Sequence, residues 1–582
     1  MDFFPRPEYP RPDLVRTKWL NLNGRWQFCL DPGLSGVSRG LADPGTTLPQ
    51  EIVVPFCPES RLSGIAHTDF MAGVWYRRTF TIPEDWSGKR IILHFGAVDY
   101  LAHVWVNGKL LGSHRGGYSP FSFDVTDALG AGTNVLTVFA EDDTRSPLQP
   151  SGKQSIRYES HGCHYTRTTG IWQTVWMEPV PDVHVTGLHF VPDLHQAKVL
   201  VEVLASRAAE GARAEITLSA GGEAVGFGEG YVIGGAASVV VPVNTVRLWS
   251  PEDPFLYDVS VRLRAAGHAE DTVASYMGLR TLGTRGRALL LNGQPRFQRL
   301  VLDQGFYPDG IYTAPTDEDL KRDIKISQAA GFDGARLHMR VFEPRFLYWA
   351  DKLGYLAWGE YPNWGLDLSN PAALIRVQEE WLSILRRDVN HPSIVGWCPF
   401  NETHQQPPRD PDILRLVYRT TKLFDPTRPC IDTSGYVHTE CTDVYDSHCY
   451  EQDVAKFAAN FAGMISGHEV WRNFPKEDAE WAGQPYFVSE YGGIWWNPGK
   501  EDGKSWGYGD RPKTEEEFLT RYRGLTETLL NHPMMCGFCY TQLYDAEQEV
   551  NGLYTYQREP KFDPAIFREI NRQKAAVENT EP

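Results

Sequence analysis

Several features that would define a class of protein are scarce in this chain. Its 582 residues include only nine cysteines, which are too few and too scattered for a disulfide scaffold and leave at least one thiol unpaired. The close pair Cys536 and Cys539 lies in an apolar, strand-like run, which favours packing positions over a redox or metal motif. No run approaches the roughly 18 apolar residues that span a bilayer. The sequence therefore predicts reduced cysteines and no membrane segment.

Clustered positive charge and a leader segment are also missing. The formal net charge is −17 and is spread without long runs, whereas nucleic acids and anionic membranes bind clustered lysine and arginine. Residues 1–7 contain no basic region followed by an apolar stretch, so we expect no secretory signal. These absences predict a cytoplasmic protein without nucleic-acid or membrane partners, acting on a neutral small molecule or a sugar.

The residues that are present indicate two β domains followed by an α/β domain. Residues 1–180 show short alternating strands, with Asn107-Gly108 between two apolar runs as in a tight hairpin. This pattern predicts a β-sandwich. Residues 181–281 repeat such strands over a length that suits an immunoglobulin-like β-sandwich.

From residue 282 to residue 582, apolar strands alternate with amphipathic helices, which is typical of parallel βα units. The candidate strands are residues 297–302, 331–338, 354–360, 394–401, 429–433, 444–450, 485–490 and 537–542. Eight parallel strands close into a (β/α)8 TIM barrel, whose reactive groups lie at the carboxyl ends of the strands. The candidate catalytic residues are therefore expected at those ends.

Two of these strand ends carry a glutamate, Glu402 after the fourth strand and Glu490 after the seventh. Retaining hydrolysis of a glycosidic bond needs such a pair, one attacking the anomeric carbon and one protonating the leaving oxygen. Tyr450 and nearby arginines are placed to hold Glu490 as an anion, whereas the apolar Trp397 and Phe400 precede Glu402 and predict a raised pKa. Spacing alone leaves structural ion pairing as an alternative.

Several stretches resemble glycoside hydrolase family 2, the family of β-galactosidases, β-glucuronidases and β-mannosidases, over almost the whole chain. These stretches are residues 105–108, 168–173, 291–295, 388–394, 401–402 and 489–492. The resemblance implies a first sandwich of the jelly-roll, sugar-binding type, followed by the immunoglobulin-like domain and the barrel. It also implies that Glu402 is the general acid/base, Glu490 the nucleophile, Asn401 a donor to the sugar 2-hydroxyl and Tyr450 a hydrogen-bond partner of the nucleophile.

Further substrate-binding candidates come from the other strand ends and from nearby aromatic residues. They are Asp303, His338, Arg340, Glu360, His448, Trp495 and Gln542. The mechanism requires no metal or cofactor, and the resemblance makes a homo-oligomer an expectation.

The residues around the glutamates depart from well-known members of the family. Residues 336–340 lack the usual pattern after the second strand, and residues 551–553 lack the lysine with which β-glucuronidases meet the uronate carboxylate. The expected activity is an exo-acting retaining β-glycosidase of β-galactosidase type, on galactopyranosides or on galactofuranosides or arabinosides. A β-glucuronidase, with Arg336 or Arg340 as the cation, and a catalytically inactive carbohydrate-binding protein are the alternatives.

Overall fold

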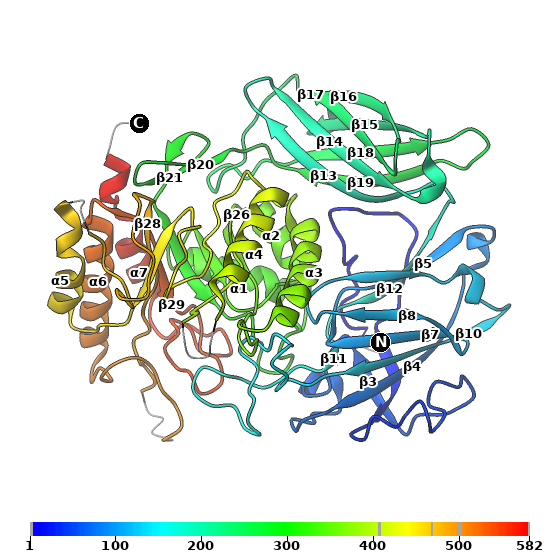
Figure 1. Ribbon diagram of the computed structural model, residues 1–582, viewed down its shortest axis with the longest axis horizontal. Helices are drawn as coiled ribbons and strands as arrows, with labels where there is room; N and C mark the ends of the chain where they lie inside the picture. Colours follow the sequence, from blue (N-terminus) through cyan, green and yellow to red (C-terminus); the bar gives the residue numbers. More distant parts are fainter. Residues whose placement is uncertain (1–3, 405–408, 467–468, 499–502, 580–582) are drawn as a thin grey trace.

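The computed structural model describes residues 4–404, 409–466, 469–498 and 503–579. Two β-sandwiches lie beside a helix-covered parallel sheet, and the chain passes through them in sequence order (Figure 1). Within the described residues, no helix is long and apolar enough to cross a membrane.

The first sandwich packs its sheets around a core of aromatic and branched aliphatic side chains. One sheet has the order β1 (Leu20–Asn21), β12 (Val175–Val180), β5 (Arg90–Phe95) and β9 (Phe121–Asp124). The other has the order β3 (Gln50–Val54), β2 (Gly24–Leu30), β4 (Gly73–Thr81), β10 (Thr133–Glu141), β7 (Leu101–Val106) and β8 (Lys109–Arg115), and a small sheet pairs β6 (Val98–Asp99) with β11 (Gly170–Ile171). Asn107 and Gly108 join β7 to β8 with φ of 51° and 79°, the positive values that the predicted tight hairpin needs.

The second sandwich is built from strands in which buried and exposed residues alternate. One sheet has the order β13 (Val185–Asp193), β14 (Lys198–Ala205) and β17 (Ala236–Pro242). The other has the order β16 (Glu223–Tyr231), β15 (Arg213–Ala220), β18 (Tyr257–Arg264) and β19 (Asp271–Met277). A short antiparallel sheet of β20 (Leu282–Arg285), β21 (Ala288–Leu291) and β22 (Gln294–Pro295) then leads into the barrel.

The barrel strands and helices alternate as the sequence predicts. Across the described residues, the parallel sheet has the order β26 (Ile394–Cys398), β25 (Leu356–Glu360), β24 (Gly334–Leu337), β23 (Gln298–Asp303), β29 (Met535–Thr541), β28 (Tyr486–Gly492) and β27 (Tyr445–Cys449). The helices are α1 (Asp317–Ala329), α2 (Pro344–Leu353), α3 (Pro371–Asp388), α4 (Pro411–Phe424), α5 (Val454–Ala462), α6 (Glu515–Asn531) and α7 (Pro564–Asn571).

The predicted fifth strand, residues 429–433, is not a regular strand. This segment meets β26 in one isolated parallel bridge, Trp397 with Cys430, and a second bridge joins Asn401 to Ser434 just beyond both. Pro429 has no N–H to offer a ladder, and the Cys430 N–H donates to the Asp443 carboxylate at 2.9 Å instead of to a backbone carbonyl. The segment therefore fills the place of the fifth strand in the barrel without forming a ladder.

Alternate residues of each barrel strand face two different cores. One core includes helix residues such as Leu320 and Ile324 together with Val301, so it lies between the strands and the helices. The other contains strand and loop residues such as Leu300 and Leu302, and it fills the inside of the curved sheet. This alternation decides which side chain at each strand end can reach the barrel mouth.

Candidate active site

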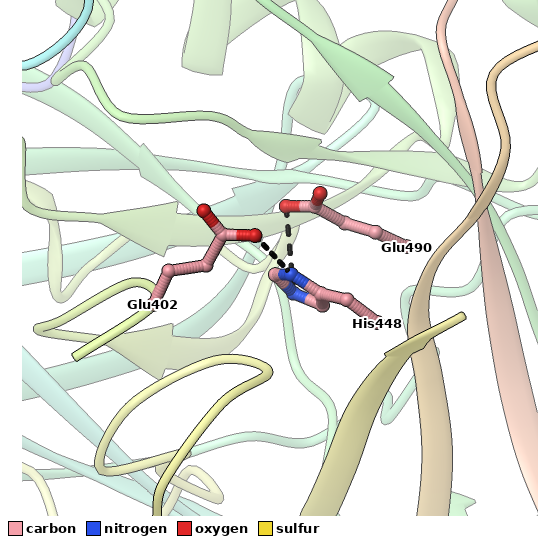
Figure 2. A group of neighbouring side chains, drawn as sticks. All are labelled: Glu402, His448 and Glu490. Carbon is pink, nitrogen blue, oxygen red and sulfur yellow. Dashed lines mark hydrogen bonds and ion pairs between the residues drawn. The ribbon is translucent and has the colours of Figure 1, made fainter. Parts of the chain in front are cut away.

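Glu402 and Glu490 meet at the barrel mouth. Glu490 lies in β28, whereas Glu402 follows β26 and donates its N–H to the Ser434 carbonyl at 2.8 Å. The φ of Glu402 is 50°, a left-handed conformation that costs a non-glycine residue about 1–3 kcal/mol. An oxygen of each carboxylate and a ring nitrogen of His448 all lie within 4.8 Å of one another (Figure 2). The structure thus brings the two predicted glutamates into one site.

His448 bridges the two carboxylates. The register of β27 and β28 places His448 beside Glu490. Its Nδ1 is 2.7 Å from Oε1 of Glu402, and its Nε2 is 3.4 Å from Oε1 of Glu490. Burial lowers the pKa of His448, but the charge of Glu490 and the hydrogen bond and charge of Glu402 raise it overall. The two acids therefore favour the protonated form of the imidazole that lies between them (Figure 2).

The pKa of Glu402 shifts in the direction opposite to our prediction. Burial raises it, but the His448 hydrogen bond and charge, together with the charge of Lys153, lower it overall. Trp397 and Phe400, which we expected to raise it, belong to the core between strands and helices. The free site therefore holds Glu402 as a carboxylate.

Two donors point at the Glu490 carboxylate, as the sequence predicts. The Tyr450 hydroxyl donates to Oε2 at 2.5 Å, and the Arg336 guanidinium donates to Oε1 at 3.2 Å. The ring of Tyr508 stacks on that of Tyr450 with centroids 3.5 Å apart. Tyr450 therefore holds one oxygen of Glu490 and Arg336 holds the other, which fixes the orientation of the carboxylate.

Arg336 also organises the buried side chains beneath the site. Its Nε donates to Oε1 of Glu360 at 2.6 Å, and Oε2 of Glu360 lies 3.2 Å from Nδ1 of His338. The Met339 N–H donates to the same Oε2 at 3.1 Å. Burial lowers the pKa of His338 well below its ordinary value, so this imidazole is neutral. Glu360 uses both oxygens to hold these neighbours, which favours positioning over the direct substrate contact that we predicted.

Asn401 keeps one polar atom unused. Its N–H donates to Oδ1 of Asn363 at 2.7 Å, and its own Oδ1 accepts from Nη2 of Arg336 at 3.1 Å. The remaining Nδ2 is buried and has no hydrogen-bond partner in the described part of the chain. A buried donor of this kind is costly unless a ligand accepts from it.

The contacts of Asp303 argue against a substrate contact at the barrel mouth. Its Oδ1 accepts from the Tyr544 hydroxyl and from the Gly305 N–H, and burial followed by the charge of Asp323 raises its pKa to about 6. Asp323 belongs to α1, so Asp303 faces the helices. The next residue, Gln304, donates to Gln542 at the site, so the surroundings favour Gln304 over Asp303, whose substrate contact stays a prediction.

Arg340 is also committed elsewhere. Its guanidinium donates to the carbonyls of Gly305 and Tyr312 and lies 4.3 Å from the centroid of the Tyr312 ring. These contacts argue against Arg340 as a uronate-binding cation. Trp495 is half-buried with the Arg511 guanidinium 5.4 Å from its ring centroid, and its predicted contact with sugar stays a prediction.

Gln542 is part of a chain of side chains that crosses the site towards the first sandwich. Its Oε1 accepts from Nε2 of Gln304 at 2.8 Å, and its Nε2 donates to Oδ1 of Asn551 at 2.7 Å. Asn551 donates to Oε1 of Glu549 at 3.0 Å, and the Tyr165 hydroxyl donates to Oε2 of Glu549 at 2.5 Å. The barrel and the first sandwich therefore share one network at the site.

Sequence reasoning missed Lys153, Tyr436, Glu549 and Gln304. Lys153 comes from the first sandwich, where no strand-end signal marks it, yet its charge acts on Glu402. Burial and then the charge of Glu402 raise the pKa of Tyr436, which follows the irregular fifth segment. Of these four residues, only Gln304 could have been predicted, because it directly follows the first barrel strand.

Among the described residues, the group with a geometry suited to a metal ion is Glu402, His448 and Glu490. Carboxylate oxygens and an imidazole nitrogen are common zinc ligands. The same atoms are those that acid/base and nucleophilic chemistry would use, and that chemistry needs no ion.

Family models match most of the chain, domain by domain. The glycosyl hydrolases family 2 sugar binding domain matches residues 63–176, the glycosyl hydrolases family 2 model matches residues 183–280, and the family 2 TIM barrel domain matches residues 316–571.

Curated relatives are similar over different shares of the chain. A β-glucuronidase from Paenibacillus borealis is 23% identical over 619 residues, covering 96% of this chain and 98% of that protein. A β-galactosidase from Thermoanaerobacter pseudethanolicus is 27% identical over 394 residues, covering 62% of this chain and 48% of that protein.

Solved structures share the fold. A Ruminococcus gnavus β-glucuronidase in complex with D-glucuronic acid has a TM-score of 0.79 at 19% identity, covering 98% of this chain and 100% of that one. A Bifidobacterium dentium β-glucuronidase complexed with coumarin-3-O-glucuronide has a TM-score of 0.77 at 21% identity, covering 97% of this chain and 98% of that one. With the domain matches and the paired glutamates, these similarities identify the chain as a member of glycosyl hydrolase family 2 and as a β-glycosidase.

Proposed function

We propose that the chain is a retaining exo-β-glycosidase that releases terminal sugars by double displacement. The observation that carries this proposal is the short separation of Glu402 and Glu490, whose carboxylate oxygens approach within 4.8 Å. Retaining enzymes place their carboxyls about 5–5.5 Å apart, whereas inverting enzymes need about 6.5–9.5 Å to fit a water between them. The separation therefore supports direct attack by one carboxylate.

Glu490 is the proposed nucleophile. Tyr450 and Arg336 orient its two oxygens, and they stabilise the negative charge before attack. In the first step an oxygen of Glu490 bonds to the anomeric carbon while the bond from that carbon to the leaving oxygen breaks. Glu402 gives a proton to the leaving oxygen in the same step, which prevents its departure as an alkoxide.

Glu402 must first obtain that proton, and His448 is its proposed source. Nδ1 of His448 and Oε1 of Glu402 lie 2.7 Å apart and share one proton. Because the pKa of His448 is raised and that of Glu402 is lowered, the proton is on His448 in the free site. Transfer along this hydrogen bond makes Glu402 an acid. In the second step Glu402 takes a proton from water, the water oxygen bonds to the anomeric carbon, and Glu490 leaves as a carboxylate.

Asn401 is the proposed donor to the sugar 2-hydroxyl. Arg336 occupies its Oδ1, so the free Nδ2 is the atom left for substrate. A contact to the 2-hydroxyl strengthens as charge develops on the ring in the transition state.

The sugar that we propose is uncharged, of the β-galactoside type, as a galactopyranoside, galactofuranoside or arabinoside. In the loop after β29, Glu549 and Asn551 are hydrogen-bonded to each other, and Lys561 pairs with Asp545 at 2.6 Å. This loop thus offers a carboxylate and an amide to the sugar. A β-glucuronidase is the second candidate, because β-glucuronidases are prominent among the relatives.

The alternative of an inactive carbohydrate-binding protein is tested by Glu490→Ala. We expect kcat/KM on the best aryl glycoside to fall by more than about 10³-fold, since the nucleophile is removed. Glu318→Ala, at an exposed position of α1, is the control and retains activity. Equal hydrolysis by the Glu490→Ala variant and the unaltered chain would reject the assigned nucleophile.

Substrate and stereochemistry are tested together. The panel consists of nitrophenyl galactopyranoside, galactofuranoside, arabinoside, mannoside and glucuronide, with the configuration of the first-formed sugar followed by NMR. Release of the β-anomer supports double displacement. Release of the α-anomer from a β-glycoside contradicts it.

A further inference from the structure

One cation beside the two catalytic candidates has no hydrogen-bond or ion-pair partner among the residues that the structure describes. Lys153 is 6% exposed and lies on the loop between β10 and β11 of the first sandwich. Its ammonium is 4.4 Å from the centroid of the Trp364 ring, and it makes no hydrogen bond or ion pair with any described residue. An ammonium has three N–H donors, and in Lys153 none of them is used by a described residue. The N–H donors of the Lys153 ammonium are therefore available to a ligand that accepts hydrogen bonds.

The contacts of its loop place Lys153 beside the reaction site. Tyr165, whose N–H donates to the Lys153 carbonyl, donates its hydroxyl to Glu549. Trp364, which lies under the ammonium, follows Asn363, whose Oδ1 accepts from the Asn401 N–H at 2.7 Å.

Burial lowers the pKa of Lys153, but Cys163 and the carboxylates of Glu549, Glu490 and Glu402 raise it overall. The group thus remains an ammonium next to both proposed catalytic residues.

The loop that carries Lys153 is held rigidly against the barrel. The Lys153 carbonyl accepts from the Tyr165 N–H at 2.7 Å, and the Ser155 N–H donates to the Tyr165 carbonyl at 2.8 Å. The Ser151 N–H donates to the Trp364 carbonyl of the barrel at 2.7 Å. The backbone that carries the ammonium is consequently positioned by both domains, and the Trp364 ring of the barrel lies against the ammonium itself.

The carboxylate of Glu549 carries the charge opposite to that of the Lys153 ammonium. It is 2% exposed, and its two oxygens accept from Tyr165 and from Asn551 at 2.5 and 3.0 Å. Each carboxylate oxygen has a second lone pair, so Glu549 can still accept from a ligand. Tyr165 neighbours Lys153 in the same loop, and the first sandwich therefore positions both members of the pair.

We propose that Lys153 and Glu549 together select an uncharged sugar, the ammonium donating to its hydroxyl groups and the carboxylate accepting from them. A hydroxyl both donates and accepts and so satisfies both residues, whereas a uronate carboxylate only accepts. A uronate would also meet Glu549 as a like charge, which costs several kcal/mol at a desolvated contact. The pair deepens the proposed function, on which this inference rests, by naming the substrate class of that glycosidase.

The test compares Lys153→Met, Glu549→Gln and the unaltered chain on the five nitrophenyl glycosides. Lys153→Met should lower kcat/KM on the preferred uncharged glycoside by about 10–100-fold, the range for a hydrogen bond to a charged group. Glu549→Gln removes the like charge, and it should raise the ratio of glucuronide to uncharged-glycoside kcat/KM at least tenfold. Lys109→Met, an exposed lysine of β8 in the same sandwich, is the matched control.

Two further measurements separate this inference from the proposed mechanism. Thermal melting shows whether each variant folds, and calorimetric titration with the free sugars measures selection without hydrolysis. Weaker binding of uncharged sugar by a folded Lys153→Met variant supports the pair even if the product anomer contradicts double displacement. A preference of the unaltered chain for glucuronic acid, or unchanged binding and kcat/KM in a folded Lys153→Met variant, would overturn the inference.

Discussion

At the scale of single residues, His448 decides when Glu402 can act as an acid. The pKa of His448 is raised in the folded protein. The stability that His448 contributes is therefore complete below the ordinary histidine pKa of about 6.5, and it is lost as the pH rises through the pKa of the folded state. The lowered pKa of Glu402 has the opposite effect, with a contribution present above its ordinary value and lost as the pH falls. The pair is therefore charged and stabilising between these limits.

This coupling predicts the basic limb of the pH–activity profile. In the unaltered chain, the proton needed for the first step is lost only as the pH rises through the raised pKa of His448, above about 6.5. In His448→Gln, Glu402 alone must hold that proton, and its ordinary pKa is about 4.3. We expect the basic limb of kcat/KM to move at least about one pH unit lower in the variant, measured with an aryl glycoside.

The control is His103→Gln, which changes a partly buried histidine of β7 in the first sandwich, in contact with Glu141. Its profile should match that of the unaltered chain. An unchanged basic limb in His448→Gln would show that His448 does not supply the proton.

Whether a site residue could be predicted from the sequence depended on whether the sequence shows which face of its strand points into the barrel. Glu402 and Glu490 were found because an apolar strand ends in an acid, and both meet at the barrel mouth. The strand before Asp303 is buried on both faces, so its sequence does not reveal which residue points inward. Lys153 was beyond such reasoning, because packing between domains brings it to the site from a loop far away in the sequence.

At the scale of secondary structure, strong periodic patterns were reliable and weak ones were not. The order of sandwich, immunoglobulin-like sandwich and barrel was confirmed. The prediction of a regular fifth barrel strand was wrong, because Pro429 has no N–H to donate and the Cys430 N–H donates to the Asp443 side chain. Such side-chain competition for the backbone depends on residues that are distant until the chain folds.

Helix ends gave clearer signals, and α1 offers a test. Thr316 accepts from the Asp319 N–H while the Asp319 side chain accepts from the Thr316 N–H, forming a capping box. Thr316 is exposed, so its replacement affects the cap and little packing. Thr316→Ala should lower the free energy of unfolding by about 1 kcal/mol, as measured by urea denaturation. Thr316→Ser keeps the hydroxyl and should change it little; equal losses in both variants would argue against the cap.

At the scale of the whole molecule, the first residues tie the two sandwiches together. The N–H of Val15 donates to the Ala274 carbonyl of β19 at 2.7 Å. The next residue, Arg16, pairs with Glu178 of β12 at 3.1 Å and with Asp271 of β19 at 2.7 Å. One guanidinium thus joins an acid from each sandwich.

Removing this guanidinium should weaken the junction strongly. The side chains of Arg16, Glu178 and Asp271 are 8%, 1% and 5% exposed, so Arg16→Ala leaves two acids buried without their cation. Breaking a buried pair in this way costs about 3–5 kcal/mol, which urea denaturation followed by tryptophan fluorescence would measure. Arg25→Ala breaks the exposed pair with Glu51 and should cost less than about 1 kcal/mol. If the two variants lost equal stability, the junction would owe its strength to apolar packing between the sandwiches and not to Arg16.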